Sequence, residues 1–167
     1  MEMTWKHRLL GNRGVSLIEL VVTLTILGIL ASLVLPSARL TAKRTKEIEL
    51  RRNLRTIRLA IDEYKKTFDK AVEEKKLIQS VNESGYPKTL LELVDGRDFG
   101  GAGSIKKKFL RRIPADPFYP ETDPEKRWGL RSYADKPDTK TWGGEDVFDV
   151  YSQSEETAID GSKYNEW

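Results

Sequence analysis

The sequence of 167 residues contains no cysteine and only one histidine, His7. Without cysteine the chain has neither a disulfide nor thiol chemistry, and with a single histidine it lacks the usual nucleophile and base pairs of enzymes. Two pairs of carboxylates are close in sequence, Asp62 with Glu63 and Asp146 with Asp149. Such pairs are expected by chance among 26 acidic residues. We therefore predict that the protein is not an enzyme.

A strong excess of one charge is also absent. The formal net charge is +3, and residues 1–14 contribute three basic and one acidic residue to the totals of 29 and 26. The remaining chain then holds 26 basic and 25 acidic residues, a balance that gives no electrostatic case for binding nucleic acid. The basic cluster Lys106–Arg112 contains Phe109 and Leu110 as packing residues. We interpret this cluster as a half-solvated surface element rather than a nucleic-acid patch.

Only one long hydrophobic run is present. It extends from Val15 to Leu35, 21 residues in which Glu19 is the single charge. A helix rises about 1.5 Å per residue, so this run would cover roughly 30 Å, about the hydrocarbon thickness of a bilayer. Three hydroxyl side chains within it can bond to the helix's own carbonyl groups: Thr23, Thr25 and Ser32. We predict a single membrane span over residues 15–36, followed by one small soluble domain.

Residues 1–14 form a short basic segment in front of this run. An ordinary secretory signal would have an apolar core of roughly 7 to 15 residues followed by a small-residue cleavage site, and the sequence has neither. The glycine that fits a processing point lies before the run, at Gly14. The segment Gly14–Glu19, Gly-Val-Ser-Leu-Ile-Glu, resembles the prepilin signal of type IV pilins and of the pseudopilins of type II secretion.

This resemblance implies how the chain is processed and oriented. A membrane prepilin peptidase would cut after Gly14 and methylate the new amino terminus at Val15, a position where the family usually has phenylalanine. The resemblance implies that the amino end faces the cytoplasm. The number of basic residues alone does not decide this orientation, because they lie on both flanks of the run. The chain would then be a single-pass protein of the bacterial inner membrane, with its carboxyl-terminal domain in the periplasm.

The single charge in the run needs an explanation, because a charge in a membrane-length helix is costly without a partner. The helix dipole would stabilise Glu19 by about 0.3–1 kcal/mol, which accounts for its tolerance but not for its position. The resemblance implies that Glu19 of one subunit pairs with the amine of Val15 on a neighbour and sets the register of a filament. We expect Gly14 and Val15 to be the processing residues, and Glu19 and Pro36 to be the assembly residues.

After Pro36 an apolar stripe with the spacing 4, 3, 4, 3, 4 predicts an amphipathic helix that continues to about Asp69. The stripe consists of Leu50, Leu54, Ile57, Ile61, Tyr64 and Phe68. It fits packing against the chain's own domain and, alternatively, a short coiled coil. On another face Glu47 and Arg51 have the spacing of an i,i+4 ion pair.

The carboxyl-terminal part has the pattern of a small mixed domain. Thr89–Glu92 fits a capping box that opens a short helix, and Gly96 would end that helix. The segments Trp128–Tyr133 and Val147–Ser152 predict two strands. We therefore predict an α+β, pilin-like fold with a long bent amino-terminal helix packed on a small antiparallel sheet. The predicted parts are a cleaved leader over 1–14, a transmembrane and assembly helix over 15–36, its amphipathic continuation over 37–69 and a periplasmic globular region over 70–167.

Short motifs extend the resemblance along the globular region. Their order behind the prepilin signal resembles that of the major pseudopilin of type II secretion: Tyr86-Pro87, Leu90–Leu93, Ile113–Pro117 and Phe148–Ser152. The resemblance implies calcium in the loop after the last strand, here residues 153–161. The candidate ligands are the oxygens of Glu155, Glu156 and Asp160. The alternative is a solvated acidic loop, and we expect no other cofactor.

The function that this resemblance implies is that of a structural subunit of a type II secretion pseudopilus, a periplasmic helical filament that drives protein export. Its partners would be further copies through the amino-terminal helices, the prepilin peptidase, the inner-membrane assembly platform and minor pseudopilins. Two alternatives stay open: a major or minor pilin of a type IV pilus, and a signal-anchored monomeric periplasmic domain that binds a ligand. The combination of Gly14 and Glu19 distinguishes the assembling subunits from the monomeric domain.

Overall fold

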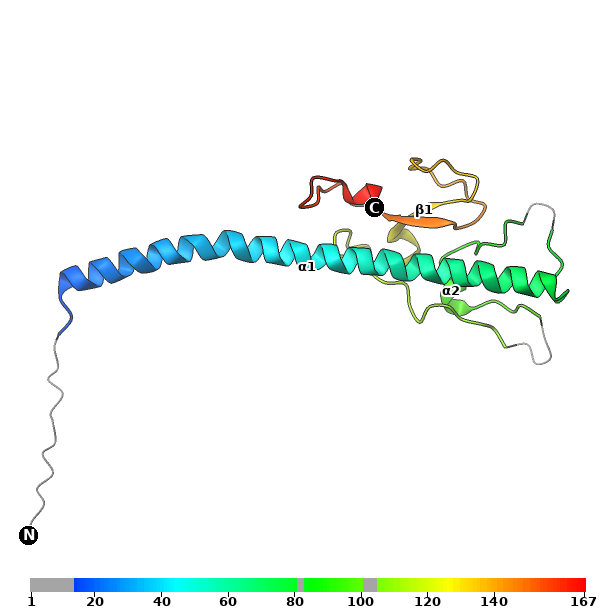
Figure 1. The fold of residues 1–167 in the computed structure, drawn as a ribbon, viewed down its shortest axis with the longest axis horizontal. Helices are drawn as coiled ribbons and strands as arrows, with labels where there is room; N and C mark the ends of the chain where they lie inside the picture. Colours follow the sequence, from blue (N-terminus) through cyan, green and yellow to red (C-terminus); the bar gives the residue numbers. More distant parts are fainter. Residues whose placement is uncertain (1–13, 81–82, 101–104) are drawn as a thin grey trace, which may run out of the picture. The chain divides into compact units, whose positions relative to one another are not determined.

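A computed structural model describes residues 14–80, 83–100 and 105–167, with the side chains of residues 33–37 excepted. The chain divides into two compact units, residues 1–41 and 42–167. Helix α1, Leu17–Glu73, contributes to both units (Figure 1). It begins two residues after the predicted start at Val15 and ends four residues after Asp69. The prediction of one long helix is confirmed, and its predicted bend stays a prediction.

The core of the second unit forms around the apolar stripe of α1. All six stripe residues are at most 2 % exposed: Leu50, Leu54, Ile57, Ile61, Tyr64 and Phe68. They pack with Leu90, Leu93, Trp128 and Val150 from the rest of the unit. Figure 1 shows the sheet on one side of α1 and α2 on the other. Because the stripe is covered by the chain's own domain, packing within the domain is confirmed and the stripe is not the seam of a coiled coil.

The sheet contains two antiparallel strands, β1 Trp128–Arg131 and β2 Asp149–Ser152. The predicted pair is confirmed, although both strands are shorter than predicted. After β1 the chain turns at Ser132. The carboxylate of Asp135 accepts a hydrogen bond from the Ser132 N–H at 2.7 Å in this turn. Gly129 lies opposite Tyr151, and a Cβ on Gly129 would come within 2.2 Å of the Tyr151 ring. Only glycine leaves space for that ring.

The short helix α2, Leu91–Asp95, begins differently from the prediction. The predicted capping box at Thr89 is wrong, because Leu90 occupies the cap position and no side chain caps the helix. The Glu92 carboxylate instead accepts hydrogen bonds from the Tyr64 hydroxyl and the Lys88 N–H. Gly96 ends the helix with a φ of 80°, as predicted. Two short 3-10 helices, η1 Pro124–Lys126 and η2 Tyr164–Glu166, were not anticipated.

The predicted ion pair between Glu47 and Arg51 is wrong, because both side chains bind the carboxyl-terminal segment instead. The Glu47 carboxylate accepts hydrogen bonds from the Ile159 N–H at 2.8 Å and from the Tyr164 hydroxyl at 2.9 Å. The Arg51 guanidinium lies 3.2 Å from Asp160 and is stacked over the ring of Trp167. These contacts attach the last residues of the described chain to α1.

A polar network crosses the core beside α2. The Tyr64 hydroxyl donates to Glu92 at 2.9 Å and accepts from Arg97 at 2.9 Å, and Arg97 also donates to Glu83 at 3.0 Å. Burial is the main reason that the pKa of Tyr64 rises to about 12, and the negative charge of Glu92 adds to it. The network joins α1, α2 and the segments on either side of α2.

Candidate processing and assembly site

The first unit carries the predicted processing site. Gly14, Val15 and Ser16 precede α1 and have no helical structure. A Cβ on Gly14 would meet no atom within 4 Å, and Val15 is 69 % exposed. The peptide bond between Gly14 and Val15 therefore lies in open, non-helical chain, where a peptidase can reach it.

Glu19 lies in the first turn of α1 and is exposed. The carbonyl of Ser16 accepts the first helical hydrogen bond, from the Leu20 N–H at 3.0 Å. Ser16 and Glu19 therefore have the positions and the S-x-x-E spacing of a capping box, a signal that the sequence contains and that our prediction missed. Within the described part of the chain, however, no side-chain hydrogen bond or ion pair involves Glu19. Its carboxylate is available to an external partner.

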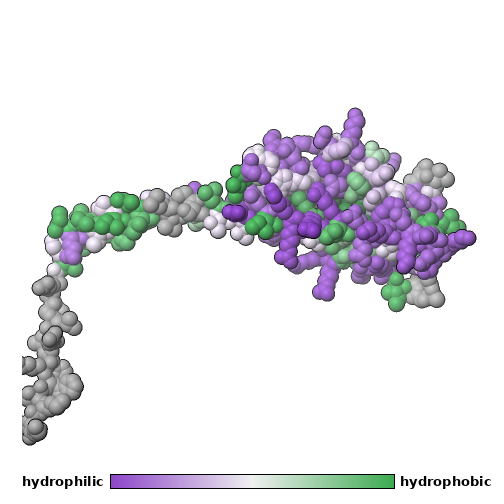
Figure 2. Space-filling view, in the orientation of Figure 1, coloured by the Kyte–Doolittle hydropathy of each residue, from purple (hydrophilic) through white to green (hydrophobic). Residues whose placement is uncertain are grey.

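The helix around Glu19 exposes a continuous apolar surface. The large apolar side chains between Val15 and Leu30 are 49–82 % exposed, and Figure 2 shows them as hydrophobic along the amino-terminal half of α1. The three hydroxyl groups donate to carbonyls of preceding residues, as predicted, at 2.7–2.9 Å: Thr23, Thr25 and Ser32. An apolar surface of this length calls for a covering, either lipid or other protein.

The predicted membrane span, residues 15–36, includes residues whose side chains the structure does not describe. Pro36, a predicted assembly residue, and the neighbouring residues 33–37 lie outside the described side chains, as do residues 1–13 of the predicted leader, which include His7. In the part of the chain that the structure describes, none of the helices is both long enough and apolar enough to cross a membrane. The span over 15–36 stays a prediction.

In the loop predicted to bind calcium, residues 153–161, the Asp160 carboxylate has partners within the chain. One carboxylate oxygen of Asp160 lies 3.2 Å from Arg51, and the other accepts hydrogen bonds from the N–H and hydroxyl of Ser162. These contacts hold the pKa of the Asp160 carboxyl below its usual value, with the Ser162 bonds as the largest cause. Nowhere in residues 14–80, 83–100 and 105–167 do three acidic or histidine side chains converge on one point. Calcium takes six to eight oxygen ligands, which include backbone carbonyls and waters, so the calcium site stays a prediction.

The short motifs of the globular region take part in hydrogen bonds within the domain. The carbonyl of Pro87 accepts a hydrogen bond from the Val147 N–H at 2.7 Å, which joins the first motif to the start of the last. The carbonyl of Pro114 accepts a hydrogen bond from the Trp128 indole at 3.0 Å. The carboxylate of Asp116 accepts a hydrogen bond from the Ser152 hydroxyl at 2.5 Å. The bond from Ser152 to Asp116 therefore joins two of the motifs directly.

The remaining charged clusters have structural contacts. Asp149 lies 2.7 Å from Arg58 and 3.2 Å from Arg131, so it joins α1 to the sheet. Within the basic cluster Lys106–Arg112, Phe109 and Leu110 are half-buried against the core, while the cationic side chains are exposed. The prediction of a half-solvated surface element is confirmed.

Comparison with known proteins supports the amino-terminal signal. Residues 10–35 match the model of the prokaryotic N-terminal methylation motif. No curated protein and no solved structure matches the chain significantly. The match includes Gly14, Val15 and Glu19, so the residues placed at the start of α1 are those of a prepilin signal. The chain carries the amino-terminal signal of a type IV pilin-like protein, and its α+β fold with a long amino-terminal helix agrees with that assignment.

Proposed function

We propose that the protein is a structural subunit of a type II secretion pseudopilus. Its precursor lies in the bacterial inner membrane, with residues 15–36 as a single span and the globular region in the periplasm. The prepilin peptidase removes residues 1–14 and methylates the amine of Val15. The inner-membrane assembly platform then extracts the subunit into a periplasmic filament, together with minor pseudopilins.

One observation carries this proposal. A processing signal is followed directly by a helix that exposes apolar side chains over its first turns, with a single unpartnered carboxylate at Glu19. Lipid covers such a surface in the precursor, and the helices of neighbouring subunits cover it in a filament. A monomeric domain needs an anchor of this kind but has no use for the carboxylate, so the position of Glu19 favours assembly.

The chemistry of assembly follows from the cut. Cleavage after Gly14 creates a positive amine at Val15, and the Glu19 carboxylate of a neighbour neutralises it inside a packed helical core. An ion pair away from water is strongly felt when one partner is removed, at about 3–5 kcal/mol. The pair therefore selects one axial register for each added subunit.

The globular region supports the secretion filament over the alternative of a type IV pilus pilin. Of the segments that resemble the major pseudopilin, Ile113–Pro117 and Phe148–Ser152 are joined by the hydrogen bond from Ser152 to Asp116, and Pro87 accepts a hydrogen bond from Val147, the residue before the last segment. The two alternatives share the amino-terminal signal, so this domain is the part of the chain that separates them.

The variant Glu19→Ala tests the proposed assembly. In cells with the full machinery we expect normal precursor levels and normal cleavage, but loss of chemically crosslinked multimers. The matched control is Glu73→Ala, which removes an exposed carboxylate near the other end of α1 and should leave the multimers intact. Normal multimers in Glu19→Ala would contradict the role of Glu19 in assembly, and a wild-type chain that gives no multimers would support the signal-anchored monomeric domain instead.

A further inference from the structure

Three aromatic rings form a cluster on the surface of the second unit. Tyr86 and Tyr133 are stacked with their ring centres 5.7 Å apart, and Phe148 meets both edge-on at 5.1 and 5.4 Å. Tyr133 is 64 % and Phe148 42 % exposed. We call Tyr86, Tyr133 and Phe148 the aromatic knob. Exposed aromatic clusters of this kind are typical of protein interaction sites.

Carboxylates and two lysines surround the aromatic knob: the Lys65 ammonium lies 5.7 Å from the centre of the Tyr86 ring and is paired with Asp69, and Lys88 lines the same hollow as Tyr86. Asp62 and Glu145 are exposed, and in the described chain no ion pair involves either of them. Glu145 lines one hollow together with Tyr86. Burial and then the charge of Asp62 raise the pKa of the Tyr86 hydroxyl, which places Asp62 near this ring. Rings with a negative rim attract a cation, and the guanidinium group of arginine also stacks on them.

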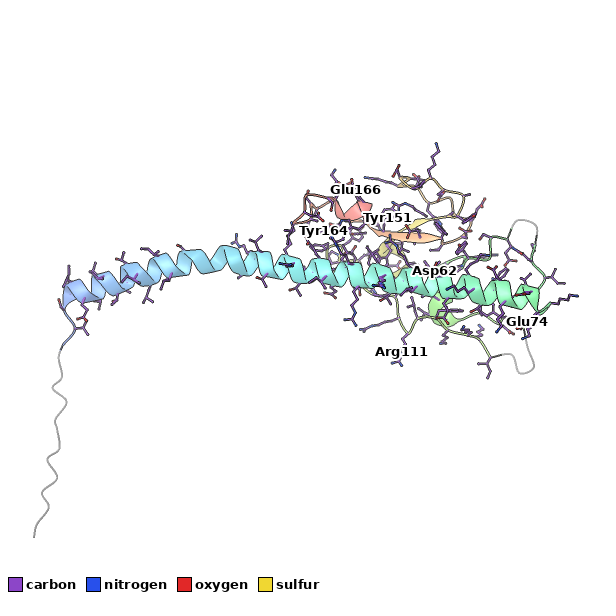
Figure 3. All side chains as sticks on the ribbon, viewed as in Figure 1. Asp62, Glu74, Arg111, Tyr151, Tyr164 and Glu166 are labelled. Carbon is purple, nitrogen blue, oxygen red and sulfur yellow. The ribbon has the colours of Figure 1, made fainter. Side chains whose placement is uncertain are left out.

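A groove of about 800 Å³ lies elsewhere on the same unit, between α1 residues 45–56 and the segment 110–115. Arg52, Arg111 and Arg112 line it, and all three are exposed without an ion pair in the described chain. Figure 3 shows Arg111 on the side of α1 away from β1. Its apolar lining includes Ile48, which is 63 % exposed, and its only carboxylate is that of Glu49. We call this the basic groove.

We propose that the aromatic knob of one copy of this chain seats in the basic groove of the next copy. The two surfaces are complementary in charge and in their apolar area. Three arginines meet three aromatic rings with a carboxylate rim, and the apolar lining of the groove covers the exposed ring surface. The groove volume lies within the range of about 300–1,000 Å³ that holds a compact ligand group.

The geometry of this contact agrees with a filament. The aromatic knob and the basic groove are different surfaces of one chain, so the contact is heterologous, and each added copy leaves one knob and one groove free at the two ends. A heterologous contact that does not close into a ring generates an open helical array. This inference rests on the proposed function and names the globular contact that accompanies the Glu19 pair.

Crosslinking tests the contact cleanly, because the chain contains no cysteine. The full chain carrying both Tyr133→Cys and Arg112→Cys is produced with the assembly machinery and treated with a short bismaleimide. We expect a ladder of multimers, since every copy presents both thiols. Each single variant should give no crosslinked ladder, because only one side of the contact then carries a thiol. The control pair joins Tyr133→Cys to Ile78→Cys, a 96 % exposed position outside the groove, and should give no ladder.

Charge reversal provides the second test. Arg111→Glu with Arg112→Glu should lower the yield of multimers, detected with a lysine-reactive crosslinker, by more than about tenfold because like charges then face each other. Asp62→Lys with Glu145→Lys should have the same effect, and the combined fourfold variant should restore the multimers. The matched control Lys106→Glu with Lys108→Glu makes the same change outside the groove and should leave the yield unchanged.

The possible failures are distinguishable. If multimers that depend on Glu19 persist while the cysteine pair gives no ladder, the knob and groove do not meet and the proposed function stands. A product that stops at the dimer, or an adduct of the Tyr133 position with a different protein, overturns the contact between successive copies. If the wild-type chain forms no multimers at all, the proposed function fails together with this inference.

Discussion

Replacing Tyr64 by phenylalanine removes one buried oxygen that joins α1 to α2 and to Arg97. The hydroxyl makes two hydrogen bonds to charged groups, to Glu92 and from Arg97, both at 2.9 Å. Hydrogen bonds of this kind contribute about 1.5–3 kcal/mol each. After the change Arg97 keeps Glu83 at 3.0 Å and Glu92 keeps the Lys88 N–H at 3.2 Å. We therefore expect the variant to lose about 2–3 kcal/mol of unfolding free energy.

The assay is thermal unfolding of the full chain in detergent, followed by circular dichroism. A loss of this size should lower the melting temperature by roughly 5–15 °C. Tyr133→Phe is the matched control, because it removes the same atom from a side chain that is 64 % exposed, and it should change stability by less than about 0.5 kcal/mol. Equal melting temperatures for the two variants would refute the structural role of the network.

Tyr64 also leads us to predict that the stability of the fold decreases at high pH. The pKa of Tyr64 rises from an ordinary value near 10 to about 12 in the folded chain, mainly because of burial. The folded state therefore favours the neutral phenol, and this contribution to stability is present below about pH 10 and is lost as the pH rises through about 12. Tyr64→Phe should show a smaller loss of stability over this range than the wild-type chain.

Two further predictions concern the carboxyl-terminal half. Burial raises the pKa of the Asp116 carboxyl above its usual value, although hydrogen bonds from Ser152 and Phe118 act in the opposite direction. The stability of the wild-type chain relative to Asp116→Asn, measured by urea unfolding, should therefore increase as the pH falls from about 7 to about 4. A difference in stability that does not change with pH would contradict this. Glu47→Ala removes the acceptor of the hydrogen bonds from Ile159 and Tyr164. It should lower the free energy of unfolding by about 1–3 kcal/mol and speed hydrogen exchange at the Ile159 amide. The control Glu49→Ala removes an exposed carboxylate and should have neither effect.

The parts of the fold that follow from periodicity were predictable from the sequence. The stripe from Leu50 to Phe68 repeats at the helical period, and every member is buried where the spacing placed it. The two strands were also predictable, because the longer segments that contain them, Trp128–Tyr133 and Val147–Ser152, carry aromatic and β-branched residues. Such patterns depend only on neighbours in the sequence, and a single buried face is enough to fix them.

The polar contacts were less predictable because they join residues far apart in the sequence. Glu47 and Arg51 have good local spacing, yet each finds a partner more than a hundred positions later, in Ile159 and Asp160. A local ion pair on an exposed helix contributes only a few tenths of a kcal/mol, so contacts with the carboxyl-terminal segment replace it, and the bond of Glu47 to Tyr164 among them is partly buried. The oxygens of Asp160, a predicted calcium ligand, likewise bind Arg51 and Ser162.

The processing and assembly site was predictable from the sequence in its residues but not in its contacts. Gly14, Val15 and Glu19 were recognised by their order, and the structure places them in open chain and in the first turn of an exposed apolar helix. Among the described residues of a single subunit Glu19 has no partner, and the partner that we propose is the amine of another copy. The pairing is a property of the assembly and has to be tested there.

The amino terminus of the mature protein tests the central claim most directly. The full chain is purified from membranes of cells with an active prepilin peptidase, and its amino-terminal peptide is analysed by mass spectrometry. We predict that the peptide begins at Val15 and carries a methyl group on its amine. A chain that begins at Met1 in those cells would contradict the processing on which the proposed assembly depends.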